Sequence, residues 1–117
     1  MLSVRRGLEA IEFYKSAFAA QELFRVENDG SVVVRFSVDG AEFWVADESP
    51  SHSNFSPETL HGGTVRMILS TENPRALFDQ AIAAGATVVW PVAEQYGWLL
   101  GRLVDPFGHH WEIGKEL

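Results

Sequence analysis

Apolar and polar residues alternate along several stretches of this chain, and this alternation predicts β-strands. Residues 31–38 keep a strict two-residue period, so one face of that strand is expected to be buried, with the apolar positions Val32, Val34, Phe36 and Val38. Shorter strands are predicted on either side, at residues 21–27 and 41–46. The intervening Asn-Asp-Gly and Asp-Gly sequences favour tight turns, because Asn, Asp and Gly tolerate positive φ. These three strands should therefore form an antiparallel meander.

Two other stretches repeat their apolar residues at helical spacing. In residues 7–20 the predicted buried stripe is Ala10, Ile11, Tyr14, Ala17 and Phe18, while Phe13 falls outside it. The second stretch begins with Asn73, a good N-cap residue, followed by Pro74 at the first helical position, and it ends at Gly85. Its apolar stripe is Leu77, Phe78, Ala81 and Ile82. Both patterns predict a helix with one buried face.

The predicted elements occur twice in the same order. A short strand, a helix and the meander are followed by a long loop without periodicity, and then by a strand, a helix, a strand that ends at Pro91 and a final hairpin. The ranges are 1–4 for the first strand, 47–63 for the loop, and 64–71 and 87–92 for the later strands. Each unit reads βαβββ and has a helix for only one face of its sheet.

The repeat predicts an α+β protein with a single domain over residues 1–117. Module one covers about 1–47, a linker loop covers 48–63, and module two covers about 64–117. The two sheets should curl around a shared cup, with the helices on the outer face. The cup would be lined by the residues that point away from the helices.

The final hairpin carries a concentrated group of chemically active side chains. An apolar-rich strand enters the turn Asp105-Pro106-Phe107-Gly108, and two histidines, a tryptophan and a carboxylate follow it. Because successive side chains of a strand face opposite ways, Trp111 and Ile113 share one face while His110 and Glu112 share the other. We expect His110 and Glu112 to face the cup. Trp111, together with Trp90, is expected in the core under the helices.

Composition and charge narrow the function classes. The net charge is −7, which argues against nucleic-acid binding because phosphate recognition needs a basic surface. No apolar run is long enough to span a bilayer, and Arg5 and Arg6 precede a helical pattern rather than a signal peptide, so no membrane association is expected. The chain has no cysteine, which excludes disulfides and thiolate chemistry and fits a cytoplasmic protein.

Three motifs resemble those of one superfamily. They are Ala-Ile-Glu-Phe-Tyr-Lys-Ser-Ala-Phe at residues 10–18, Ala-Ala-Gly-Ala at 83–86 and Asp-Pro-Phe-Gly-His-His-Trp at 105–111. Together they resemble the vicinal oxygen chelate superfamily, specifically the PhnB-like branch of its glyoxalase/bleomycin-resistance proteins. The resemblance implies the two-module fold and a homodimer in which cups close across a two-fold axis. Lyases, dioxygenases and non-catalytic drug-binding proteins share this scaffold, so the fold alone does not assign an activity.

The resemblance also implies where metal-dependent members hold their ion, on the first and last strand of each module. Only Glu112 matches such a position. The corresponding position of module one is Trp44, which cannot ligate, and the position on the fifth strand is about Arg66, which repels a cation. The position on the first strand would lie before Met1. The sequence therefore favours a site without a metal cofactor.

The residues expected to line the cup favour an organic ligand instead. Trp44 and Trp98, with Phe55 of the loop, can stack a flat or aromatic molecule. Four further contacts are expected on the same surface: Arg66, Ile68, His110 and Glu112. Of these, Glu112 would be the polar anchor. We therefore expect a small-molecule-binding protein whose ligand could be an antibiotic or a metabolite.

Other interpretations stay open for the same residues. Glu112 could act as a catalytic general base, or it could simply pair with Arg66 or Arg35 across the cup. Alternatively, Glu112 and His110 could hold a divalent metal such as Zn, Ni, Mn or Fe with ligands from a partner chain, as in a metal-dependent lyase or dioxygenase of the glyoxalase type. A third interpretation is an assembly partner whose cup is filled by its own side chains. Surface positions are the default for the three remaining histidines, His52, His61 and His109.

Overall fold

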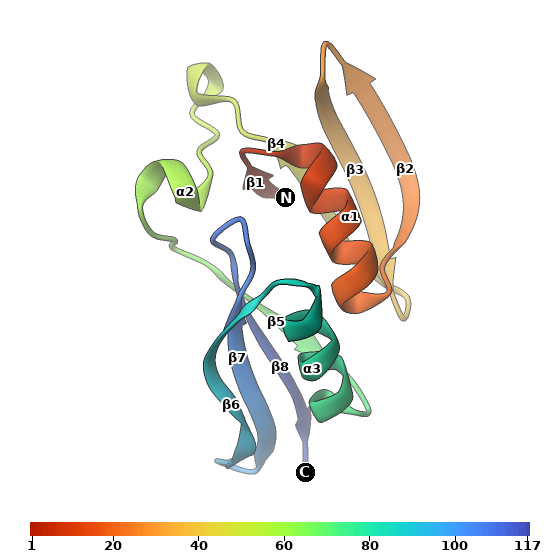
Figure 1. The fold of residues 1–117 in the computed structure, drawn as a ribbon, viewed down its shortest axis with the longest axis vertical. Coiled ribbons are helices and arrows are strands. Elements are labelled where there is room, and N and C mark those ends of the chain that lie inside the picture. Colours follow the sequence, from red (N-terminus) through yellow and green to blue (C-terminus); the bar gives the residue numbers. More distant parts are fainter.

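Each half of the chain folds as a strand, a helix and a three-stranded meander (Figure 1). In the computed structural model, which describes all residues 1–117, module one contains β1 (Leu2–Val4), α1 (Gly7–Phe18), β2 (Gln21–Asn28), β3 (Ser31–Val38) and β4 (Ala41–Asp47). Module two contains β5 (Arg66–Ser70), α3 (Pro74–Ala84), β6 (Thr87–Gln95), β7 (Trp98–Val104) and β8 (His110–Glu116). The connection between them forms a 3₁₀ helix, η1 (Pro50–His52), and a short helix, α2 (Pro57–Leu60).

The strands form two four-stranded mixed sheets with matching topology. Their orders are β1-β4-β3-β2 and β5-β8-β7-β6. In each sheet the first strand of the module runs parallel to its last strand, and the other pairs are antiparallel. The predicted α+β fold of two βαβββ modules is confirmed. In Figure 1 both helices lie on the same side of the sheets, so the opposite face of each sheet has no cover within the chain.

Helix α1 begins where Asp47, at the end of β4, accepts its first backbone N–H. The carboxylate oxygens of Asp47 accept the N–H of Gly7 at 2.9 Å and the N–H of Val32 at 2.7 Å, which ties the helix start to two strands. Gly7 is required here because a Cβ would lie 2.4 Å from the Val32 side chain. The helix ends earlier than predicted, since Ala19 takes a left-handed conformation with φ 53°.

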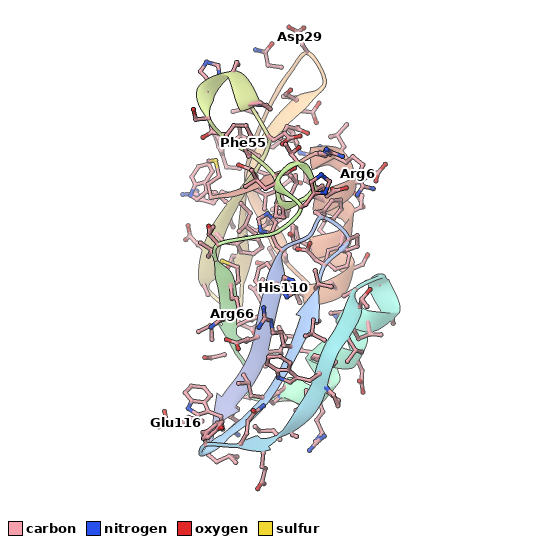
Figure 2. The ribbon with its side chains drawn as sticks, turned by 90° about the vertical axis from the view of Figure 1, so that its left-hand side faces the viewer. Arg6, Asp29, Phe55, Arg66, His110 and Glu116 are labelled. Atoms are coloured by element: carbon pink, nitrogen blue, oxygen red, sulfur yellow. The ribbon has the colours of Figure 1, made fainter.

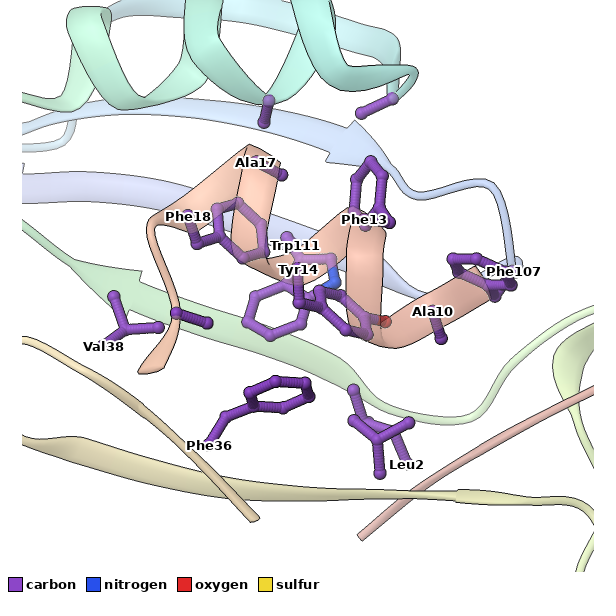
Figure 3. Close-up of a cluster of buried hydrophobic side chains, with 14 of the residues drawn as sticks. Leu2, Ala10, Phe13, Tyr14, Ala17, Phe18, Phe36, Val38, Phe107 and Trp111 are labelled. Atoms are coloured by element: carbon purple, nitrogen blue, oxygen red, sulfur yellow. The ribbon is translucent and has the colours of Figure 1, made fainter. Parts of the chain in front are cut away.

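The largest buried side chains lie between the two modules rather than inside one of them (Figure 3). The ring of Phe18 on α1 lies 4.7 Å from Trp111 of β8, and the ring of Phe43 on β4 lies 5.4 Å from the same indole. Phe13, predicted to fall outside the buried stripe, is also buried, because the β7–β8 turn places Phe107 6.0 Å from its ring. The core therefore fixes how one sheet sits relative to the other.

Asp105 at the β7–β8 turn adds a polar connection to this shared core. Its Oδ2 accepts the hydroxyl of Tyr14 at 2.5 Å and the indole N–H of Trp111 at 3.0 Å. Its Oδ1 accepts the backbone N–H groups of Phe107 and His109. Burial raises the pKa of Tyr14 well above its ordinary value, and the Asp105 charge and hydrogen bond add to this effect. The hydroxyl therefore stays a donor, and it joins α1 of module one to the hairpin that carries His110.

Three expectations for individual segments are wrong. Strand β6 does not end at Pro91 but continues to Gln95; as an edge strand it accommodates the proline within the register shift between Trp90 and Ala93. Trp90, expected in the core, is 38% exposed, whereas Trp111 is 2% exposed as predicted. The linker, expected to be a loop throughout, contains the two short helices η1 and α2.

None of the helices has both the length and the apolar character needed to cross a membrane.

Candidate ligand-binding site

The uncovered face of the second sheet brings four strands' side chains into one row. The strand register places Ile68 of β5 beside Glu112 of β8, Glu112 opposite Arg102 of β7, and Arg102 opposite Trp90 of β6. In the next row Arg66 lies beside His110, and Figure 2 shows both on this face. Because Trp111 and Ile113 point into the core, the alternation of β8 places His110 and Glu112 on the uncovered face, as predicted.

Glu112 forms an ion pair with Arg66 on this face. The Nε of Arg66 lies 3.7 Å from a carboxylate oxygen of Glu112, and the side chains are 55% and 15% exposed. Because the arginine is more than half exposed and the separation is long, this pair contributes little to stability. The other expected partner, Arg35, lies on the first sheet and pairs with Glu42 at 3.7 Å. Of the two arginines expected to pair with Glu112, Arg66 does so and Arg35 does not.

Arg102 is the residue on this face that sequence reasoning missed. Its Nε donates to Nδ1 of His110 at 3.1 Å, and its guanidinium lies 5.2 Å from the centre of the Trp90 ring. Burial lowers the pKa of His110, and the positive charge of Arg102 lowers it further. The imidazole is therefore neutral at pH 7, with Nδ1 as the acceptor. The available signal was the hairpin register, which places Arg102 directly across from Glu112.

A small hollow lies beside this cluster. It has a volume of about 140 Å³ and is lined by Ile68, Trp98, Leu100 and Glu112. Gly114 is what allows Leu100 to lie across the neighbouring strand, since a Cβ there would meet the leucine side chain at 2.5 Å. The structure thus brings Ile68, Trp98 and Glu112 together, as the sequence predicted.

Trp44 does not lie in this hollow. It lies on the uncovered face of the first sheet. The centre of its indole ring is 6.0 Å from the ring centre of Phe24 and 5.6 Å from the guanidinium carbon of Arg35. Within one chain the predicted aromatic pair of Trp44 and Trp98 is therefore divided between two sheets.

A second hollow of about 280 Å³ lies under the linker. It is lined by residues of β1, α2 and β5 and of the loops beside them, including Phe55, Leu60 and Val65. Phe55 therefore belongs to this linker hollow and not to the uncovered sheet face. His109 also borders it, and its Nε2 lies 2.9 Å from the carbonyl oxygen of Ser3. That histidine was expected at the surface, but its contact with β1 leaves it partly buried.

Comparisons with known proteins identify the family to which this chain belongs. A family model described as a glyoxalase-like domain matches residues 2–114. This chain belongs to the glyoxalase-like domain family. A protein of Mycobacterium bovis described as uncharacterized is 36% identical to the glyoxalase-like domain over 122 residues, which cover 99% of this chain and 80% of the relative.

Solved structures agree with the family assignment. The X-ray structure of an Arabidopsis thaliana gene product has 30% identity and a TM-score of 0.76, and the match covers 97% of the glyoxalase-like domain and 92% of that protein. A glyoxalase/bleomycin resistance protein/dioxygenase family enzyme from Burkholderia phytofirmans has a TM-score of 0.76 at 19% identity, covering 99% and 94% of the two chains. At that identity the likeness shows the fold alone. The glyoxalase-like domain thus shares its fold with a protein of the glyoxalase/bleomycin resistance/dioxygenase family.

The donor set of the glyoxalase-like domain does not fit a divalent metal within one chain. No group of three or more His, Cys, Asp or Glu side chains is placed to hold an ion. Glu112 is paired with Arg66, and Nδ1 of His110 is occupied by Arg102. Two guanidinium groups beside the two candidate ligands would repel a cation.

Proposed function

We propose that this glyoxalase-like domain binds a small apolar or aromatic molecule, without a metal ion, on the uncovered face of its second sheet. The observation that carries the proposal is the hollow lined by Ile68, Trp98 and Leu100, with Glu112 as its polar wall. Apolar walls with few polar groups are typical of sites that bind organic ligands. Arg66 and Arg102 contact Glu112 and His110, the two candidate metal ligands, and their positive charges would repel a cation. The proposal therefore includes no Zn, Ni, Mn or Fe.

A homodimer is part of this proposal. A hollow of about 140 Å³ is smaller than the roughly 300–1,000 Å³ of pockets that enclose drug-sized ligands. The first sheet also has an uncovered face with exposed apolar side chains, including Phe24 at 46% exposure beside Trp44. Packing this face of one copy over the second sheet of another would enclose the ligand and bring Trp44 toward Trp98. Sedimentation equilibrium should then report twice the chain mass.

The binding test uses 2-naphthamide, a neutral aromatic probe, with affinity measured by isothermal titration calorimetry. We expect Trp98→Ala to weaken binding by about tenfold, which corresponds to about 1.4 kcal/mol of lost contact. The matched control is Phe55→Ala, which removes an exposed aromatic ring from the linker hollow. It should leave the affinity unchanged. Loss of binding in Phe55→Ala but not in Trp98→Ala would move the ligand to the linker hollow and refute the site.

Metal dependence is tested on the same protein sample. Elemental analysis after dialysis should find no transition metal near one per chain, and a chelator should leave the affinity for 2-naphthamide unchanged. A stoichiometric metal whose removal abolishes binding would refute the proposal. That result would instead support the metal-dependent lyase or dioxygenase, with Glu112 and His110 completed by a partner chain.

A further inference from the structure

Arg102 is unusual among the cationic side chains of this acidic protein. Every lysine and every other arginine except Arg75 has a carboxylate oxygen within 4.0 Å. Arg75 donates instead to the carbonyl oxygen of Val92. The partners of Arg102 are uncharged: the imidazole of His110 and the indole face of Trp90. Its charge is therefore not neutralised within the chain, although the chain has a net charge of −7.

The orientation of Arg102 leaves the edge formed by its two terminal nitrogens free. The Nε of Arg102 donates to His110. The two terminal nitrogens form no hydrogen bond within the chain, and they are not among the buried atoms that lack a partner. The two contacts of the guanidinium hold its plane against the sheet. A guanidinium fixed in this way presents a planar fork that matches the two oxygens of a carboxylate.

The neighbours of Arg102 define where such an anion would lie. On the same face of β7, Leu100 is two residues away, roughly 7 Å along the strand, and it lines the hollow described above. Arg66 lies on the far side of Glu112 and is more than half exposed. Two positive charges therefore flank one negative charge at the edge of an apolar hollow. A ligand with an aromatic body and one negative charge complements this arrangement.

We propose that Arg102, supported by Arg66, forms an anion subsite that binds the carboxylate of a small aromatic acid whose ring lies against Ile68 and Trp98. This inference rests on the proposed function, because the ring occupies the same hollow. Trp90 and His110 are positioning residues that hold the guanidinium plane. Glu112 opposes the anion, and it reduces the affinity by its charge and by its pairing with Arg66.

The test compares 2-naphthoate with 2-naphthamide, which have the same ring and nearly the same size but differ in charge. We expect the wild-type protein to bind the carboxylate at least about tenfold more tightly, with a preference that falls as salt rises. Arg102→Gln should remove the preference, so that the two probes bind with affinities within about twofold of each other. Glu112→Gln should increase the affinity for 2-naphthoate, which a merely structural role for Glu112 would not produce.

The control is Arg75→Gln, which removes the other arginine without a carboxylate partner. It should keep the full preference for the carboxylate. Equal binding of both probes by the wild-type protein would overturn the anion subsite while leaving the binding function intact. Failure of both probes to bind at millimolar concentration would overturn both. A preference that survives in Arg102→Gln would show that another group recognises the charge, and would overturn the assignment to Arg102.

Discussion

Replacing Asp105 with asparagine tests the polar connection that holds the two modules together. The carboxylate accepts four hydrogen bonds, two from backbone N–H groups and two from the side chains of Tyr14 and Trp111. In Asp105→Asn the amide oxygen can keep the backbone donors, and the amide nitrogen then faces the two side chains. The Tyr14 hydroxyl can rotate to accept from that nitrogen, but the indole N–H of Trp111 cannot accept at all.

The expected loss follows from these partners. A buried donor left without an acceptor costs about 1–3 kcal/mol, and replacing charge-assisted hydrogen bonds with neutral ones adds roughly 1 kcal/mol. We therefore expect Asp105→Asn to lower the free energy of unfolding by about 2–4 kcal/mol. Tyr14→Phe removes one donor and leaves Asp105 with three, so its loss should be about 1.5 kcal/mol. The double variant should lose less than the sum, by at least about 0.5 kcal/mol, because both changes remove the same bond.

Urea titration followed by circular dichroism and tryptophan fluorescence measures these free energies. The control is Asp29→Asn, at the exposed turn between β2 and β3 labelled in Figure 2, which should stay within about 0.5 kcal/mol of the wild-type protein. A loss of less than 0.5 kcal/mol for Asp105→Asn would show that the buried network contributes little. Strict additivity of the two changes would show that Tyr14 and Asp105 act independently, which would refute the connection between the modules.

Three further predictions use the same titrations. Trp111→Ala should cost about 3–5 kcal/mol and Trp90→Ala less than about 1 kcal/mol, because only the first indole is fully buried; similar losses would contradict their different environments. Gly114→Ala should destabilise by about 1–3 kcal/mol, since its Cβ would lie 2.5 Å from a leucine side chain of β7, whereas Gly62→Ala has open space and should be neutral. Because the pKa of His110 is lowered in the folded state, the unfolded state binds a proton first as the pH falls. The free energy of unfolding should therefore decrease from about pH 6.5 down through the lower pKa of the folded state. His110→Gln should flatten this pH dependence. An unchanged slope in that variant would refute the assignment.

The local pattern of the sequence was sufficient for most of the fold. The two-residue period of β3 and the helical stripe of α1 predicted a buried strand and a one-faced helix, and the structure contains both. The Asp39-Gly40 pair predicted a hairpin turn, and both residues have positive φ in the structure. These features depend on neighbours within a few residues, so a single chain segment carries all the information. Recognising the same order twice then gave the two βαβββ modules.

Residues whose role depends on distant partners were the ones missed. Trp90 was expected in the core under the helices, but a register shift in β6 turns it toward Arg102. Phe13 was placed outside the buried stripe of α1, but the β7–β8 turn brings Phe107 against it and helps to bury it. Neither the shift nor the turn contact has a local signature.

The sequence by itself thus determined the elements, the repeat, and which face of β8 carries His110 and Glu112, because side-chain alternation along a strand is a local property. Tertiary structure alone decided which charges meet on that face. Pairing of β5, β7 and β8 placed Arg66 against Glu112 and Arg102 against His110. The division of the strands into two sheets separated Trp44 of β4 from Trp98 of β7. Strand order and register, which join residues far apart in the chain, set those contacts.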